Sequence, residues 1–197
     1  AGLLPTVAAI RKGTTVALAN KECLVSSGEI LIKELDKSKA KLLPVDSEHN
    51  AIFQVLENHN KSHLDRIILT ASGGPFYGYT KEELLDVEVQ DAIKNPNWTM
   101  GKKISVDSAT LMNKGLEIIE AKHLFNLSEE NIKVVIHRQS IAHGIVSFED
   151  NTFFAAFGHP NMTHPIKYAI FYPNNYFSVD QKMSINSLNN LTFETIN

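Results

Sequence analysis

Three short apolar runs, each followed by a polar tip and a helical pattern, constrain the fold of this chain most. The runs at 15–19, 40–45 and 66–70 have the length of strands, and polar clusters follow them at 20–22, 46–50 and 72–74. This recurring order predicts an α/β domain with a mostly parallel sheet and flanking helices. Because ligands bind at the carboxyl ends of such strands, we expect the three polar clusters to share one site.

The remaining pattern predicts a short helix in 1–11, a fourth strand at 132–136 and an antiparallel hairpin over 144–157. The hairpin turns around Glu149, Asp150 and Asn151, and phenylalanines occupy both faces of its second arm. A strand that is apolar on both faces is normally covered, so we expect the hairpin to lie at a homodimer interface. From residue 173 onward the chain shows little periodicity.

The composition is that of one globular domain, with 197 residues, 43% of them hydrophobic and 21% charged. A net charge of −3 without a basic block argues against nucleic-acid binding. No apolar run approaches the ~20 residues of a membrane span, so no membrane partner is expected. Cys23 is the only cysteine, which excludes an internal disulfide and fits a reducing compartment.

The stretch 104–121 combines a polar loop with a helical pattern, and it predicts a helix from about 108 to 125 capped by Asp107 or Ser108. At the helical repeat, Asn113, Lys114 and Glu117 fall within one arc of about 100°. The open N–H groups of the first turn, with Ser108 and Lys114, would seat a phosphate. An ordinary solvated face with a Lys/Glu pair is the alternative.

Asp46 and Glu48 are two residues apart, so their carboxylates point the same way if the strand tip is extended. Together with Glu117 they offer three hard oxygen ligands, which suit Mg²⁺ or Mn²⁺ rather than zinc. We expect these carboxylates to meet without fixed cationic partners, and simple N-capping by Asp46 is the alternative. The histidines lack metal-ligand spacing, and we expect His49, His137 and His143 to hydrogen-bond within the core.

Six collinear strings carry a specific resemblance: ALANKE at 17–22, LPVDSEHNAIFQ at 43–54, SGGPF at 72–76, PNW at 96–98, MGKKI at 100–104 and VDSATLMNKGLE at 106–117. With them the chain closely resembles the 1-deoxy-D-xylulose 5-phosphate reductoisomerase family from residue 2 to about 194. The resemblance implies a metal-dependent, NADPH-dependent rearrangement and reduction of that sugar phosphate to 2-C-methyl-D-erythritol 4-phosphate, for non-mevalonate isoprenoid synthesis. It also implies a homodimer, located in the bacterial cytoplasm or a plastid-type organelle.

The resemblance further implies roles for individual residues. Catalysis would involve Lys21, Glu48 and Glu117, and the cation ligands would be Asp46, Glu48 and Glu117. The nicotinamide side of NADPH would be contacted by Asn20, Glu22 and Gly101. The substrate would be bound by Lys21, Ser47, Glu48, Ser72, Asn95, Trp98, Ser108, Asn113, Lys114 and Glu117, with Ser72, Ser108, Asn113 and Lys114 holding its phosphate. Trp98 matches the tryptophan of the family's lid, although a tryptophan in a loop commonly anchors that loop to the core.

Several positions depart from the family pattern. Asn95 stands where the family usually has histidine, Arg138 replaces the proline of His-Pro-Gln-Ser, and Asn161 and Thr163 replace an acidic and a basic residue.

No GxGxxG dinucleotide fingerprint occurs in the sequence. We therefore expect residues 1–197 to form a single catalytic and metal-binding domain, without the family's N-terminal NADPH domain and C-terminal helical domain. A non-catalytic module that keeps the fold, dimerises or binds sugar phosphate is the alternative function.

Overall fold

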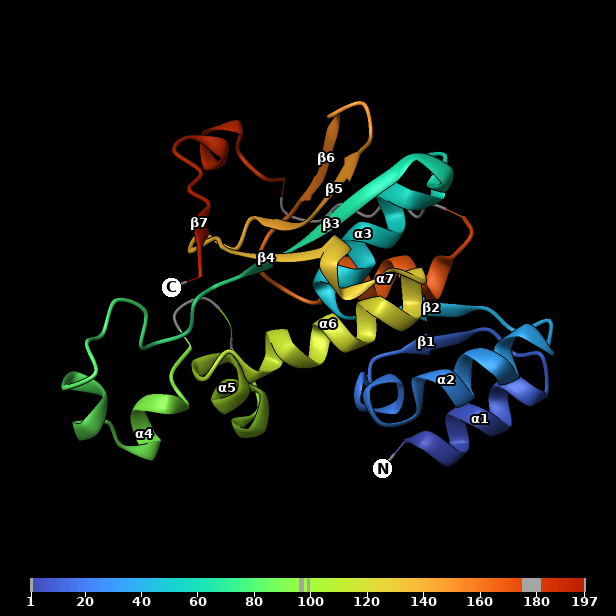
Figure 1. Cartoon of the computed structure of the whole chain (residues 1–197), viewed down its shortest axis with the longest axis horizontal. Coiled ribbons are helices and arrows are strands. Elements are labelled where there is room, and N and C mark those ends of the chain that lie inside the picture. The colour runs from blue at the N-terminus through green and yellow to red at the C-terminus, as the bar shows by residue number, and fades with distance from the viewer. Residues whose placement is uncertain (1, 96–97, 99, 175–181, 197) are drawn as a thin grey trace.

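A computed structural model describes residues 2–95, 98, 100–174 and 182–196. Within these residues the chain is an α/β structure in which helices flank β-sheet (Figure 1), as the sequence predicted. The strands are β1 (Val16–Leu18), β2 (Leu42–Pro44), β3 (Leu64–Ala71), β4 (Ile132–Ile136), β5 (Ala142–Phe148), β6 (Phe153–Phe157) and β7 (Glu194–Thr195). The α-helices are α1 (Leu3–Arg11), α2 (Glu22–Asp36), α3 (Ser47–Glu57), α4 (Val89–Ala92), α5 (Lys102–Ala109), α6 (Met112–Phe125) and α7 (Thr163–Phe171). Four 3₁₀ turns are η1 (Lys61–His63), η2 (Glu83–Asp86), η3 (Glu129–Asn131) and η4 (Ile185–Leu188).

The strands form two sheets rather than the one mostly parallel sheet that the sequence predicted. β1 and β2 make a parallel pair, and the second sheet has the order β6-β5-β3-β4-β7. In the second sheet only β3 and β4 are parallel; the other pairings are antiparallel. β5 runs antiparallel to β3 because the connection 137–141 between β4 and β5 is too short to carry the chain back for another parallel strand.

Helix α6 joins two apolar cores and crosses the middle of the molecule (Figure 1). Ala121 on α6 packs with α3 and the central strands of the larger sheet, in a cluster that includes Ile52 and Leu69. Leu124, also on α6, packs against the second cluster, which lies between α1, α2 and the small sheet. Because one helix belongs to both cores, side chains on its first turns are held at a fixed place between the two sheets.

The single helix predicted over 108–125 is broken into α5 and α6. Leu111 has a φ of 58°, in the left-handed region, and separates Ala109, the last residue of α5, from Met112. The Thr110 hydroxyl donates to the Val106 carbonyl at 3.0 Å, which closes the carboxyl end of α5. Neither Asp107 nor Ser108 caps the helix, because both lie inside α5.

The predicted hairpin is present as β5 and β6, and β6 forms an edge of the sheet as the described residues define it. Phe153, Phe154 and Phe157 on β6 are exposed by 59%, 36% and 45%. The homodimer through this edge stays a prediction.

Parts of two predicted segments lie outside the described residues. These are residues 96–97 and 99 of the tryptophan loop and residues 175–181 of the aperiodic end. None of the described helices has the length and apolarity needed to cross a membrane.

Candidate functional site

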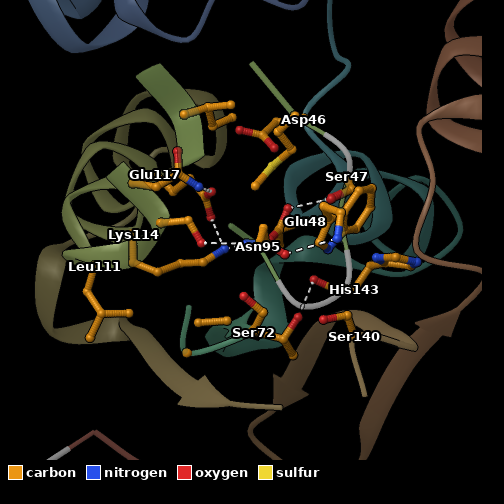
Figure 2. A pocket seen from close by; sticks show the side chains of 18 of the residues that line it. Asp46, Ser47, Glu48, Ser72, Asn95, Leu111, Lys114, Glu117, Ser140 and His143 are labelled. Carbon is orange, nitrogen blue, oxygen red and sulfur yellow. Dashed lines mark hydrogen bonds and ion pairs between the residues drawn. The ribbon is translucent and has the colours of Figure 1, made fainter. Parts of the chain in front are cut away.

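Two of the three polar clusters, 46–50 and 72–74, contribute side chains to one pocket, as expected from their places after strands; the cluster at 20–22 does not line it, but its Lys21 contacts two lining residues. The pocket lies between the ends of the two sheets, α5 and α6 (Figure 2), and holds a cavity of about 90 Å³. Ten predicted site residues line it: Asp46, Ser47, Glu48, Ser72, Asn95, Trp98, Ser108, Asn113, Lys114 and Glu117. Lys21, the N-cap residue of α2, contacts two of these residues, since its ammonium donates to Asn113 Oδ1 at 3.0 Å and to Glu117 Oε1 at 3.2 Å.

The carboxylates of Asp46, Glu48 and Glu117 converge, with one oxygen from each lying within 4.8 Å of the others. Asp46 stands at the N-cap position of α3, yet its side chain makes no capping hydrogen bond. Glu48 lies in the first turn of α3 rather than on an extended tip, so the expected geometry was wrong although the convergence is present. Three hard oxygens that are not used for capping fit a divalent cation.

The expectation that these carboxylates lack cationic partners was wrong. Lys114 Nζ lies 2.5 Å from Glu48 Oε1 and 2.5 Å from Glu117 Oε2. Lys21 pairs with Asp46 and with Glu117. Both ammonium groups are nearly fully buried, so two buried lysines partly neutralise three carboxylates. The sequence showed the Lys114–Glu117 spacing but not the long-range approach of Lys21.

Burial and neighbouring charges shift the pKa values of these groups in different directions. Burial, followed by the nearby Glu48 carboxylate, raises the pKa of Glu117 to about 7. Burial also acts on Glu48, but the ammonium of Lys114 outweighs it and holds the pKa of Glu48 far below its usual range. Against their own burial, the carboxylates around Lys114 and Lys21 raise the pKa of each amine. Both lysines are therefore charged at neutral pH, and the pKa of Glu117 lies near neutrality.

His49 and Glu120 form a buried pair next to the carboxylates. His49 Nδ1 is 3.0 Å from Glu120 Oε2, and His49 Nε2 is 3.0 Å from the Glu117 carbonyl oxygen. His49 therefore ties α3, which carries Glu48, to α6, which carries Glu117. Although burial opposes protonation, the Glu120 carboxylate raises the pKa of His49 to about 9. The predicted core role of His49 is confirmed, as is that of His137, whose ring contacts Thr192 O, Ile141 N and Ala142 N.

The opposite side of the pocket carries hydroxyl and amide groups. Ser72 lies across the pocket from Asp46 (Figure 2) and follows β3. The Asn95 side chain donates to Ser108 Oγ at 3.1 Å and accepts from the Trp98 backbone N–H at 2.9 Å. Asn95 thus links the tryptophan loop to α5. The Trp98 ring packs edge-on against His143, with ring centroids 6.1 Å apart.

The three residues assigned to NADPH by resemblance lie outside the pocket lining. Gly101 is the exposed N-cap residue of α5. Glu22, at the start of α2, accepts from Lys103 at 2.8 Å, and Lys103 also pairs with Asp107 at 2.7 Å. This ion-pair network joins the starts of α2 and α5, and Asn20 immediately precedes α2. Gly101 is therefore next to Met100 of the pocket lining, and the segment that holds Asn20 and Glu22 is connected to α5, which lines the pocket, through Lys103.

Sequence reasoning missed several lining residues, above all His143, which it assigned to the core. His143 and Ser140 line the pocket with the apolar side chains of Met100, Ile104, Leu111 and Met162. Burial lowers the pKa of His143. The available signal was the topology: β5 runs antiparallel to β3, so its first residues lie beside the carboxyl end of β3.

Comparisons with known proteins agree with this geometry. Residues 42–125 match the family model described as the 1-deoxy-D-xylulose 5-phosphate reductoisomerase C-terminal domain, and residues 1–28 match the model described as 1-deoxy-D-xylulose 5-phosphate reductoisomerase. Reductoisomerases of Clostridium botulinum and Clostridium perfringens are each 52% identical over 193 residues, which is 98% of this chain. The chain spans about half the length of these curated relatives, since the matches cover 50% of each.

Solved structures show the same similarity. A reductoisomerase crystal structure in complex with NADPH, fosmidomycin and magnesium has a TM-score of 0.92 at 42% identity, over 100% of this chain and 50% of that one. The enzyme from Zymomonas mobilis in complex with NADPH has a TM-score of 0.91 at 44% identity, with the same coverage. On sequence and fold together, the chain belongs to the 1-deoxy-D-xylulose 5-phosphate reductoisomerase family.

Proposed function

We propose that this chain supplies the cation site and the substrate site of a reductoisomerase. The reaction is the rearrangement of 1-deoxy-D-xylulose 5-phosphate and its reduction by NADPH to 2-C-methyl-D-erythritol 4-phosphate. The observation that carries the proposal is the convergence of Asp46, Glu48 and Glu117 within 4.8 Å at a pocket whose far side carries Ser72 and Ser108. The magnesium and NADPH complexes of similar proteins support the same assignment.

The residues divide into two groups by chemistry. Asp46, Glu48 and Glu117 would hold Mg²⁺ or Mn²⁺, which when bound polarises substrate oxygens and stabilises negative charge on them. Ser72, Ser108, Asn113 and Lys114 would hold the phosphate. These donors lie on β3's carboxyl end, α5 and α6, so they are carried by rigid elements.

Lys21 and Ser47 complete the polar lining. The Lys21 ammonium sits among Asn113, Asp46 and Glu117 and stays charged, so it orients an oxygen of the substrate as a hydrogen-bond donor. Ser47 Oγ donates to Glu48 Oε2 at 2.6 Å and so fixes one cation ligand. Trp98 and the apolar side chains around it would exclude water from the reacting carbons.

The alternative, a non-catalytic module, is less well supported. The two buried ammonium groups of Lys21 and Lys114 only partly neutralise the three converging carboxylates, and a bound divalent cation would supply the remaining positive charge. Asn95, the main departure near the pocket, keeps a structural link through Ser108 and Trp98 rather than leaving a gap.

The cation assignment is tested by titration calorimetry with Mn²⁺ and Mg²⁺. We expect Glu117→Gln to weaken binding strongly, because a neutral amide replaces a buried ligand. Glu29→Gln is the matched control, since Glu29 is 81% exposed on α2 and remote from the pocket. Mn²⁺ binding that is the same in wild type and Glu117→Gln would show that Glu117 is not a ligand.

We propose that substrate binding and NADPH consumption can be separated in this chain. NADPH would approach the pocket beside Asn20, Glu22 and Gly101, but the sequence has no glycine-rich dinucleotide fingerprint. The 197-residue chain should therefore bind the sugar phosphate in the presence of Mn²⁺ without consuming NADPH steadily. Steady loss of NADPH absorbance with this chain alone would contradict the division.

We also propose that the protein is a homodimer formed through β6. Phe153 and Phe157 are exposed on an edge strand, where unpaired backbone groups favour strand addition. Light scattering should give about twice the chain mass of 21.9 kDa, and Phe153→Asp should shift the equilibrium to monomer. A monomer at micromolar concentration in the wild type would argue against this interface.

A further inference from the structure

Arg138 lies directly behind the loop that follows β3. β3 and β4 are parallel neighbours, and Ala71, the last residue of β3, is paired with Ile136, the last residue of β4. Because the two chains leave the sheet side by side, Ser72 and Gly73 emerge beside His137 and Arg138. This topology brings a cation to the polar tip of a neighbouring strand.

The Arg138 guanidinium donates hydrogen bonds to two backbone carbonyls of the loop. Nη1 donates to Ser72 O at 2.5 Å and to Gly74 O at 2.8 Å. The guanidinium also lies over the Tyr77 ring, 4.7 Å from its centroid, and the Tyr77 hydroxyl donates to Glu194 on β7. Arg138 is thus fixed by ring stacking while it holds the loop, which favours one orientation of the loop peptides.

The loop is closely packed from both sides and requires glycine. Gly73 and Gly74 have φ values of 80° and 68°, in the left-handed region. A Cβ on Gly74 would lie 2.8 Å from the Ser108 carbonyl oxygen, and one on Gly73 would lie 3.3 Å from Arg138 Nη1. The loop therefore separates Arg138 from the pocket, which Ser72, Gly73 and Ser108 line.

The peptide between Ser72 and Gly73 presents its N–H as a hydrogen-bond donor on the side of the loop that faces the pocket. In a planar trans peptide the N–H points opposite to the carbonyl, so the Gly73 N–H points away from Arg138, toward the pocket side of the loop. The bond from a cation to the Ser72 carbonyl polarises that peptide and strengthens its N–H as a donor. Ser72 Oγ accepts from the Gly74 N–H at 3.3 Å, which leaves the hydroxyl hydrogen of Ser72 to donate outward.

We propose that Arg138 is a positioning residue that orients the Gly73 amide as a phosphate donor beside Ser72. This inference rests on the proposed function, because it assigns the phosphate group of the substrate to this side of the pocket. Arg138 does not line the pocket, so it would act on the phosphate through the loop.

The test follows the amide NMR signal of Gly73 in the isotope-labelled chain during titration with inorganic phosphate. In the wild type we expect a downfield shift of this amide that saturates with phosphate. Arg138→Met should weaken phosphate binding about tenfold, the effect of losing one charge-assisted contact, and should reduce the Gly73 shift. Arg66→Met is the control, because Arg66 pairs with Asp65 near the start of β3, at the far end of that strand; it should change neither quantity.

Mn²⁺ binding, measured by calorimetry on the same samples, separates this inference from the proposed function. Arg138→Met should keep the wild-type Mn²⁺ affinity, which shows that the carboxylate site is folded. Should Arg138→Met not fold, Arg138→Lys decides, since lysine keeps the charge but lacks the planar fork; we expect at least about twofold weaker phosphate binding. Phosphate binding and a Gly73 shift equal to wild type in the folded variant, or no Gly73 shift in a wild type that binds Mn²⁺, would overturn the proposal.

Discussion

The buried pair of His49 and Glu120 should make the stability of the protein depend on pH in a way that one substitution removes. Both side chains have no exposed surface, and Nδ1 of His49 lies 3.0 Å from Glu120 Oε2. The pair connects α3 with α6, so its loss is felt where the two helices carry Glu48 and Glu117. We consider Glu120→Gln, which keeps the shape of the side chain and removes its charge.

The magnitude follows from the pKa of His49. Folding raises it from 6.5 to about 9, which corresponds to about 3 kcal/mol of stabilisation when the ring is charged in both states. Because the folded pKa is the higher one, this stabilisation is complete below pH ~6.5. It falls as the pH rises, to about 2 kcal/mol near pH 7.5, and is lost above the folded value of about 9.

Urea denaturation in chelator-containing buffer at several pH values measures the effect. We expect the wild type to be more stable than Glu120→Gln below pH ~6.5. The difference should shrink as the pH rises to ~9, because Glu120 is the strongest of the three carboxylates that raise the pKa of His49. Glu149→Gln is the matched control, because the His63–Glu149 pair has the same chemistry at 3.2 Å but each side chain is 65% exposed. A difference between wild type and Glu120→Gln that does not change with pH would refute the reasoning.

Two further predictions concern the cation and the helix packing. Because Glu117 has a pKa raised to about 7 and must be deprotonated to bind metal, Mn²⁺ affinity should rise with pH up to about 7 and then level off; calorimetry in buffers of different ionisation enthalpy would detect the released proton. Gly28→Ala should destabilise the chain by about 1–3 kcal/mol, since its Cβ would lie 2.1 Å from the His123 ring, whereas Gly115→Ala, with nothing within 4 Å of its Cβ, should stabilise by roughly 0.5–1 kcal/mol; thermal denaturation compares them.

The local pattern of the sequence was sufficient for most elements. The strand at 132–136 and the helix that begins after Asp46 follow from apolar periodicity and polar tips, and both are present. The break at Leu111 was not predictable in this way. A leucine with positive φ is unfavourable by itself. Leu111 is held by backbone hydrogen bonds, because its N–H donates to the Ser108 carbonyl at 3.3 Å and its carbonyl accepts from the Lys114 N–H at 3.0 Å.

For the site, residue types were predictable but their partners were not. The carboxylate at Glu117 and its neighbour Lys114 share a helix face, which spacing alone reveals. The approach of Lys21 crosses 96 positions of sequence, and His143 reaches the pocket only because β5 reverses direction beside β3. Such contacts depend on strand order, which composition and periodicity do not encode.

The position of Lys114 leads to a last prediction, that the cation and phosphate strengthen each other's binding. Its ammonium lies 2.5 Å from both Glu48 and Glu117, the same carboxylates that are proposed to hold the cation. When a divalent cation takes those oxygens, the buried ammonium needs another anion, and a phosphate in the pocket supplies it. Linkage requires the effect to be reciprocal.

Inorganic phosphate titrations with and without Mg²⁺ measure this coupling, and we expect phosphate to bind at least about fivefold more tightly with Mg²⁺ present. Lys114→Gln should abolish the coupling, and any pairing of Mg²⁺ with phosphate in solution would survive in that variant and can be subtracted. Lys33→Gln, on an exposed face of α2, is the control and should behave as wild type. If Lys114→Gln keeps the full coupling, the ammonium does not move between the two anions, and the carboxylates alone must account for both sites.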